Sequence, residues 1–190
     1  MPMDMITREQ AMELLRAQRP EPHMIQHALA SEAVLRALAG HLGEDAELWG
    51  LVGLLHDLDY PLTQGRPEQH GLRGAELLAG RLPEVALTAI RAHNAGYTGV
   101  EPAGALDFAL RCGETVTGLV ITAALVRPAG LSGMEAKSLK KKMKDKAFAA
   151  SVNRDSIREC ERIGLDLDAF LALAIAAMTP HADVLGLRRA

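Results

Sequence analysis

Signals that start and stop α-helices recur along almost the whole chain. Thr7 and Gln10 form a capping box that opens the first predicted helix, which ends near Gln18 before a proline-containing turn. Beyond it, apolar residues recur three to four positions apart, the spacing of a helix that buries one face. Aromatic residues make up only 3% of the sequence, whereas the strong helix formers Ala and Leu are abundant. An all-α fold is therefore expected.

The same signals divide most of the chain into separate helices. The third helix is expected to end at Tyr60, because the residue before Pro61 avoids the helical region of backbone conformation. Gly164 is expected to cap the C-terminus of another helix. The predicted helices span residues 7–18, 23–41, 45–60, 69–79, 84–93, 105–126, 153–163 and 166–178.

The remaining segments are predicted to be loops, a basic helix and a tail. Residues 63–68 and 94–104 are polar or contain Gly and Pro, which favours loops. Ser132 and Glu135 predict a capping box before a lysine-rich helix. The tail after Pro180 is expected to be loosely held.

The bulk composition limits the partners of the chain. It is 48% hydrophobic and 24% charged, as in an ordinary globular protein, and its net charge of -3 provides no positive field for long nucleic acid. Cys112 and Cys160 are too few for a disulfide framework and are expected to be buried thiols. Polar residues at the start of the chain argue against a signal peptide, and the apolar run 169–178 is too short for a bilayer. We therefore expect a cytoplasmic location without a membrane partner, and leave a homodimer open.

The feature with the clearest chemistry is the sequence Leu-Leu-His-Asp-Leu-Asp at residues 54–59. A His and an Asp after an apolar helix are costly to bury without partners, and metal coordination satisfies both. Neighbouring residues diverge by about 100° around a helix. His56 and Asp57 can therefore share an ion only where the helix ends, and the stop at Tyr60-Pro61 would supply the bend.

Further candidate ligands lie on other predicted helices. His27 precedes the pair, and His70 and His93 follow it near the ends of two helices. Glu114 lies within the long apolar helix, where a carboxylate needs a partner. The order along the chain is therefore His, His-Asp, His, His, carboxylate.

In this order of ligands the chain resembles the HD superfamily of metal-dependent phosphohydrolases. The resemblance covers about residues 24–118. It continues more loosely through the basic segment SLKKKMKDKAF at 138–148, which is similar to the C-terminal part of small HDIG-type proteins. It implies an HD-domain helical bundle over residues 1–130, with a core at about 22–127. A C-terminal helical extension over residues 131–190 is expected to pack on the same core.

The resemblance also implies a role for each candidate ligand. His27, His56, Asp57 and the last carboxylate would hold a first metal ion. His70 and His93 would add a second one, bridged to the first by Asp57. The expected cofactors are one or two divalent transition metal ions (Mn, Fe, Ni or Zn, with Mg also open), since mixed His and carboxylate ligands do not select among them.

One position departs from the family pattern. The last ligand of the family is an Asp in a motif like Ala-Asp-Glu-Leu-Thr-Gly, whereas this chain has Cys-Gly-Glu-Thr-Val-Thr-Gly at residues 112–118. The alignment places Glu114 at the ligand position, where its extra methylene displaces the oxygens and Gly113 would make room. Asp107 is the rival ligand, because it lies two turns earlier on the same helix face.

Such ligands suit the cleavage of a phosphate ester. A divalent metal lowers the pKa of a bound water to about 7, and two ions about 3.5–4 Å apart hold the attacking and leaving oxygens. Asp57, as the bridging carboxylate, is one candidate catalytic residue. Asp59 is the other: it could move a proton, orient a ligand histidine, or simply occupy the turn before Pro61.

Three further residues are candidate contacts to the substrate. Lys141 and Lys144 lie in the basic segment, and an ammonium can bind a phosphate; a solvated helix face is the alternative interpretation. Every fourth residue from Leu139 to Ala147 is apolar, so that face is expected to pack on the core. Tyr97 lies in the loop after His93 and could face a substrate.

The expected function is hydrolysis of a nucleotide or another small phosphate ester. Two alternatives stay open. The departure at Glu114 motivates a degenerate HD domain that binds a nucleotide or metal without turnover. A di-iron oxygenase on the same scaffold is the third interpretation, because some proteins of this architecture use two metals for oxygen chemistry.

Overall fold

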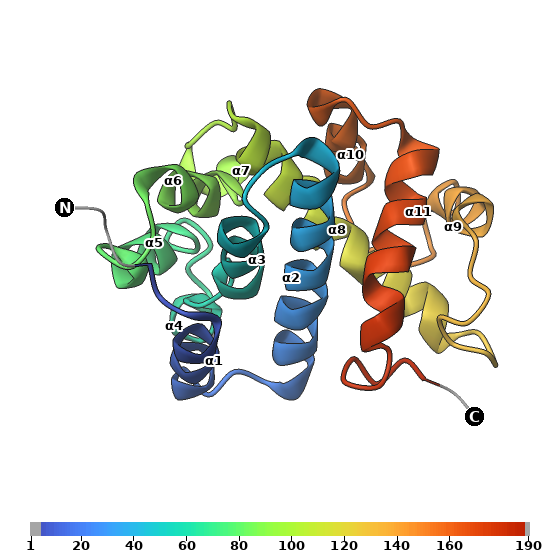
Figure 1. Ribbon diagram of the computed structural model, residues 1–190, viewed down its shortest axis with the longest axis horizontal. Coiled ribbons are helices and arrows are strands. Elements are labelled where there is room, and N and C mark those ends of the chain that lie inside the picture. Colours follow the sequence, from blue (N-terminus) through green and yellow to red (C-terminus); the bar gives the residue numbers. More distant parts are fainter. Residues whose placement is uncertain (1–4, 189–190) are drawn as a thin grey trace.

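The computed structural model describes residues 5–188, a bundle of helices without a β-strand in that range (Figure 1). This confirms the expected all-α class. The absence of a signal peptide is a prediction that falls partly on residues 1–4, outside the described part. The helices are α1 (Arg8–Ala17), α2 (Pro22–Leu42), α3 (Ala46–Leu55), α4 (Tyr60–Thr63), α5 (Leu72–Leu78), α6 (Glu84–Ala92), α7 (Ala95–Thr98), α8 (Ala105–Leu125), α9 (Ala136–Met143), α10 (Arg154–Arg158) and α11 (Leu167–Met178), with 3-10 turns η1 (Glu159–Ile163) and η2 (Thr179–His181).

The two longest helices, α2 and α8, pack against each other at the centre of the bundle (Figure 1). Leu35 and Leu38 of α2 are fully buried in this contact. A Cβ atom at Gly113 of α8 would lie 2.6 Å from Cδ2 of Leu35, so a larger residue there would require the Leu35 side chain to move. Gly113 therefore leaves room for a side chain of α2, and room for Glu114 stays a prediction.

The packing of α3 on α2 also depends on a glycine. A Cβ atom at Gly53 would lie 2.7 Å from the carbonyl oxygen of Ser31. The backbones of the two helices are therefore in direct contact near the end of α3. This contact places the residues that follow α3 close to the first part of α2.

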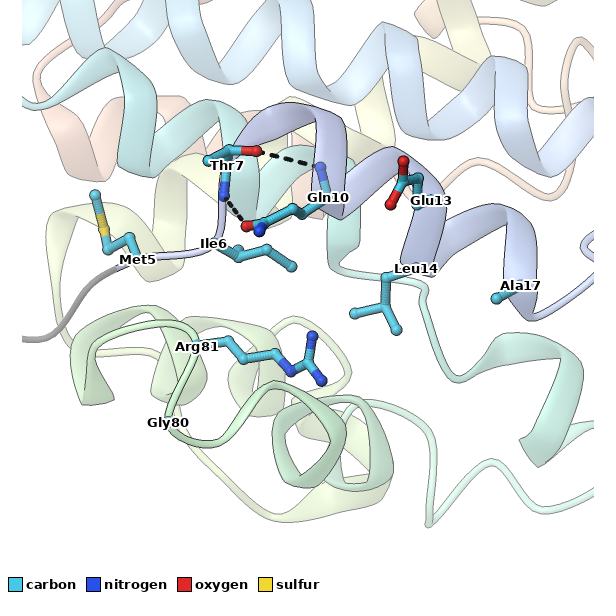
Figure 2. A pocket seen from close by; sticks show the side chains of 9 residues that line it. All are labelled: Met5, Ile6, Thr7, Gln10, Glu13, Leu14, Ala17, Gly80 and Arg81. Carbon is cyan, nitrogen blue, oxygen red and sulfur yellow. Dashed lines mark hydrogen bonds between the residues drawn. The ribbon is translucent and has the colours of Figure 1, made fainter.

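An ion-pair network joins the first three helices. Glu32 of α2 is buried, and its Oε1 accepts hydrogen bonds from Arg8 Nε at 2.6 Å and Arg36 Nε at 3.1 Å. Arg36 also donates to Glu47 of α3 at 2.6 Å. Two guanidinium groups thus satisfy a carboxylate that would be costly to bury alone. The capping box of Thr7 and Gln10 is present at the start of α1, as predicted (Figure 2).

The chain after residue 131 packs on the same core. Phe170 and Leu171 of α11 are fully buried, and α11 contacts both α2 and α8. Arg111 of α8 donates to both carboxylate oxygens of Glu159, at 2.6 and 2.7 Å, and to the carbonyl oxygens of Ala92 and His93. One guanidinium group therefore links α8, the end of α6 and the C-terminal part. The division at residue 130 itself stays a prediction.

Several predicted boundaries were wrong. The helix that begins at Ala46 ends at Leu55, before Tyr60, and Pro61 lies in the first turn of α4, where its missing N–H is tolerated. The segment 94–104 is not wholly a loop, because it contains α7. The cap at Gly164 is confirmed, with a left-handed φ of 80°.

The basic segment and the tail also differ from the prediction. Ser132 and Glu135 form no capping box: Glu135 is the N-cap of α9 without a side-chain hydrogen bond. Because α9 ends at Met143, Ala147 lies outside the helix and is exposed. The tail is not loosely held as far as residue 188, since Leu185 and Leu187 are each 2% exposed and pack into the core.

The helix α8 is long and apolar enough by composition to cross a membrane. However, 61% of its apolar window is buried inside the fold. Its hydrophobicity is therefore that of the central helix of a bundle.

Removal of a core side chain at the contact of α2 and α8 should lower the stability of the fold. We expect Leu35→Ala to cost about 2–5 kcal/mol of unfolding free energy, because the cavity cannot close in a tightly packed region. Chemical denaturation measures this value. Leu62→Ala, at a position 43% exposed, is the control and should change it by about 0.5 kcal/mol or less. Equal effects of the two variants would contradict the packing described here.

Candidate metal centre

Four histidines and one aspartate converge where several helices begin or end. His27 lies in α2, and His56 and Asp57 follow α3 directly. His70 lies just before α5, and His93 just after α6. The chain turns tightly after His56, with hydrogen bonds from the N–H of Leu58 to Leu55 O and from the N–H of Tyr60 to Asp57 O, both at 3.0 Å.

The carboxylate of Asp57 lies at the centre of this cluster. Its Oδ2 is 3.6 Å from Nε2 of His27. Its Oδ1 is 3.1 Å from Nε2 of His70, 3.4 Å from that of His56 and 3.5 Å from that of His93. Asp57 therefore belongs to two donor groups at once, one with His27 and His56 and one with His70 and His93.

The Nε2 atoms of the histidines meet in two pairs. Those of His27 and His56 are 3.1 Å apart, and so are those of His70 and His93. All four rings meet edge to face or nearly so, which directs the nitrogen atoms toward common points. Whether the two nitrogens of a pair share a hydrogen bond or can bind a metal ion depends on which of them carries a proton.

The Nδ1 partners assign the protons of two of these rings. Nδ1 of His56 is 2.8 Å from the carbonyl oxygen of Gly53, and Nδ1 of His93 contacts that of Ile90. A carbonyl oxygen only accepts, so each Nδ1 carries the proton. In the neutral form of both rings, Nε2 is therefore an unprotonated donor atom for a metal.

The other two rings follow the same rule. The hydroxyl of Thr117 donates its one proton to the carbonyl oxygen of Glu114 at 2.6 Å, so it accepts from Nδ1 of His27 at 2.9 Å. The carboxylate of Asp59 accepts from Nδ1 of His70 at 2.9 Å. Histidines that ligate metals typically donate their second N–H to an oxygen in this way.

Two pairs of nitrogen lone pairs at 3.1 Å repel each other unless a positive charge lies between them. Either a proton or a metal cation can fill that role. The donor set of imidazole nitrogens with a shared carboxylate fits a divalent metal site at each pair. The residues present therefore fit the cofactor that the sequence predicts.

Burial and charge set the protonation of the cluster. Burial lowers the pKa of His56 to about 3, which keeps this ring neutral. Burial would raise the pKa of Asp57, but the surrounding histidines hold it well below its ordinary value. For His70, in contrast, burial would lower the pKa, but the hydrogen bonds of this ring with Asp57 and Asp59 raise its pKa to about 10. Without a metal, His70 therefore carries the proton of the second pair.

Asp59 is fully buried and positions the second donor group. Its Oδ2 accepts hydrogen bonds from the backbone N–H of Gly71 and Gly74, both at 2.8 Å, while its Oδ1 holds His70. Gly71 has a φ of 88°, and a Cβ atom there would lie 2.8 Å from Ile90 O. The roles of these two glycines and of Thr117 were not predicted from the sequence, although a glycine directly after the candidate ligand His70 was a visible signal.

The structure separates the two candidates for the last ligand. Oε2 of Glu114 is 3.7 Å from Nε2 of His27, at the edge of the first donor group. Glu114 is not among the three residues of that group, whose donor atoms all lie within 4.8 Å of one another. Burial raises the pKa of Glu114. Asp107 is engaged elsewhere, because its Oδ2 accepts from the backbone N–H of Ala103 and Gly104, both at 2.9 Å, at the start of α8.

A cavity of about 290 Å³ opens on the first donor group. His27 and Glu114 form one wall, and Ser151, Asn153 and Ser156 contribute polar side chains to another. Neither Lys141, Lys144 nor Tyr97 lines this cavity. Lys144 lines a separate one, and Tyr97 is 63% exposed in α7.

Another cavity, of about 760 Å³, lies between α1 and the turn at Gly80-Arg81 (Figure 2). The Arg81 side chain extends beneath α1 toward Leu14 (Figure 2). No histidine lines this space, and its lining includes one acidic residue, Glu13. It therefore offers no set of metal ligands among the described residues.

The comparisons with known proteins identify the class to which this fold and site belong. The profile of the HD domain matches residues 24–145, more than half of the chain. The chain therefore belongs to the HD domain family, as the order of ligands predicted. No curated protein and no solved structure matches it.

Metal binding should release protons and strengthen as the pH rises. His70, with a pKa raised to about 10, is protonated at neutral pH, and a cation at its Nε2 must displace that proton. We expect release of roughly one proton per ion in the second donor group. Calorimetry at pH 7 in buffers of different ionisation enthalpy measures it. A binding heat independent of the buffer would contradict the assignment.

Loss of Asp59 should weaken the second donor group selectively. In Asp59→Ala, Nδ1 of His70 has no acceptor, and we expect metal affinity there to fall about 10–100-fold while the first group keeps its ion. Metal titration with stoichiometry gives both values. Glu44→Ala, at an exposed acidic position, is the control. Loss of both ions, or of neither, would show that Asp59 does not act through His70.

Proposed function

We propose that the protein is a metal-dependent phosphohydrolase acting on a nucleotide or another small phosphate ester. The observation that carries the proposal is the sharing of Asp57 by two groups of histidine nitrogens. A bridging carboxylate between two divalent ions fits the in-line displacement of a phosphate ester. Membership of the HD domain family supports this class of reaction.

Each donor group has its own residues. His27, His56 and Asp57 would hold the first ion, with Glu114 beside them. Asp57, His70 and His93 would hold the second. Bound divalent ions would activate water and offset negative charge on the phosphate. Mn, Fe, Ni and Zn suit these ligands better than Mg, which prefers oxygen atoms.

The chain itself would bind and orient the ester in the cavity beside His27. Ser151 and Ser156 offer hydroxyl groups at this cavity, and Asn153, whose amide oxygen caps α10, offers its N–H₂ group. These uncharged groups suit hydrogen bonds to phosphate or sugar oxygens. A volume of about 290 Å³ suits a small substrate. Contacts of Lys141, Lys144 and Tyr97 with the substrate stay predictions, as do the cytoplasmic location, the absence of membrane and long nucleic acid partners, and a homodimer.

The variant Asp57→Ala should lose the metal of both donor groups together with turnover, and His56→Ala should lose the first ion and turnover. Asp57 belongs to both donor groups, whereas His56, which is 1% exposed, belongs to the first. Elemental analysis of the purified protein and a screen of phosphate esters with the metal found are the measurements. His23→Ala, at an exposed histidine one turn before His27, is the matched control. Full turnover in Asp57→Ala would refute the proposal, and iron with oxygen uptake would favour the di-iron oxygenase.

The place of Glu114 at the edge of the first donor group supports a second candidate, an HD domain that binds a ligand without turnover. The variant Glu114→Asp distinguishes the two. If the domain is degenerate, the shorter side chain should create or raise hydrolysis. Unchanged or lower activity would count against degeneracy.

A further inference from the structure

A second cavity, with a strongly basic lining, lies in the C-terminal part of the fold. It has a volume of about 700 Å³ and is lined by residues of α9, α10, the segment between them and the start of α11. Its charged lining residues are Lys140, Lys144, Lys146, Arg154, Arg158 and one acid, Asp155. The whole chain has a net charge of -3, so this concentration of positive charge is local.

Carboxylates neutralise only part of this charge. Lys140 pairs with Asp168 at 2.7 Å, and Arg158 lies 3.9 Å from Glu161. Lys144 and Lys146 have no ion-pair partner within residues 5–188. Uncompensated ammonium groups around a concave site favour an anionic ligand.

Arg154 shapes this cavity. Its guanidinium group donates to the carbonyl oxygens of Ala149 at 2.6 Å, Val152 at 2.5 Å and Asp145 at 3.2 Å, and to that of Phe148. These bonds fix the segment 145–152 without neutralising the positive charge. This wall of the cavity is therefore held in place by a positively charged group, which adds to the local positive potential.

The rest of the lining is apolar. Met143 and Leu167 are buried core residues that also line this cavity. Val152 lines both this cavity and the one beside His27. An apolar wall next to several ammonium groups matches a ligand with an organic part and more than one phosphate. The volume lies within the usual range for a ligand of this size.

We propose that this basic pocket binds a small organic molecule carrying two or more phosphate groups, at a site separate from the metal centre. Lys144 and Lys146 bind the phosphates, and the wall formed by Met143, Val152 and Leu167 contacts the organic part. The site does not depend on hydrolysis at the metal centre, so either proposal can fail alone.

Calorimetric titration of the full chain with pyrophosphate and with adenosine diphosphate tests the proposal. We expect both to bind, adenosine diphosphate more tightly, and Lys144→Ala and Lys146→Ala each to weaken binding about tenfold. Lys137→Ala, an exposed lysine of α9 that does not line the pocket, is the matched control and should bind as the wild type does. His56→Ala should also retain binding.

Four outcomes would overturn the proposal. Absence of binding refutes the site. Equal weakening in Lys137→Ala would mean that only the general charge of α9 attracts the anion. Loss of binding in His56→Ala would mean that the anion binds at the metal centre. Equal affinity for pyrophosphate and adenosine diphosphate would show that the apolar wall does not contribute to binding. Thermal melting of each variant shows whether the fold is intact.

Discussion

The carboxylate of Asp57 is the group on which the arrangement of the site depends. It contacts four imidazole nitrogens at 3.1 to 3.6 Å, and those nitrogens otherwise face each other in pairs. Its charge persists because its pKa is held well below the ordinary value. The four rings can converge only because a negative charge, together with a proton or a metal cation, offsets the repulsion of their lone pairs.

Close packing of the helices brings the four histidine rings together. Gly53 lets α3 touch α2, which brings His56 beside His27. Gly113 lets α8 approach α2, which brings Glu114 to the edge of the same group. Metal–ligand distances tolerate only a few tenths of an ångström, so these glycines at the helix contacts help to define the geometry of the centre.

The sequence predicted the helices well and several of their ends poorly. Periodic apolar residues mark a helix because they recur over many positions, and the long helix at 105–125 was found almost to the residue. Ends depend on single residues: Pro61 marks a first turn where a stop was predicted, and Ser132 makes no cap. The candidate ligands followed from the order of His and Asp residues, whereas the carbonyl oxygens of Gly53 and Ile90 that orient His56 and His93 carry no signature in sequence.

The sequence by itself therefore determined the helical class, the family and the residues able to bind a metal, since these depend on local spacing and residue type. Only the tertiary structure decided which nitrogens pair, that Glu114 approaches the centre while Asp107 caps α8, and that basic residues of α9, α10 and the segment between them line one cavity. The physical reason is that the distance between side chains on different helices depends on how the helices pack, and packing is a property of the whole core.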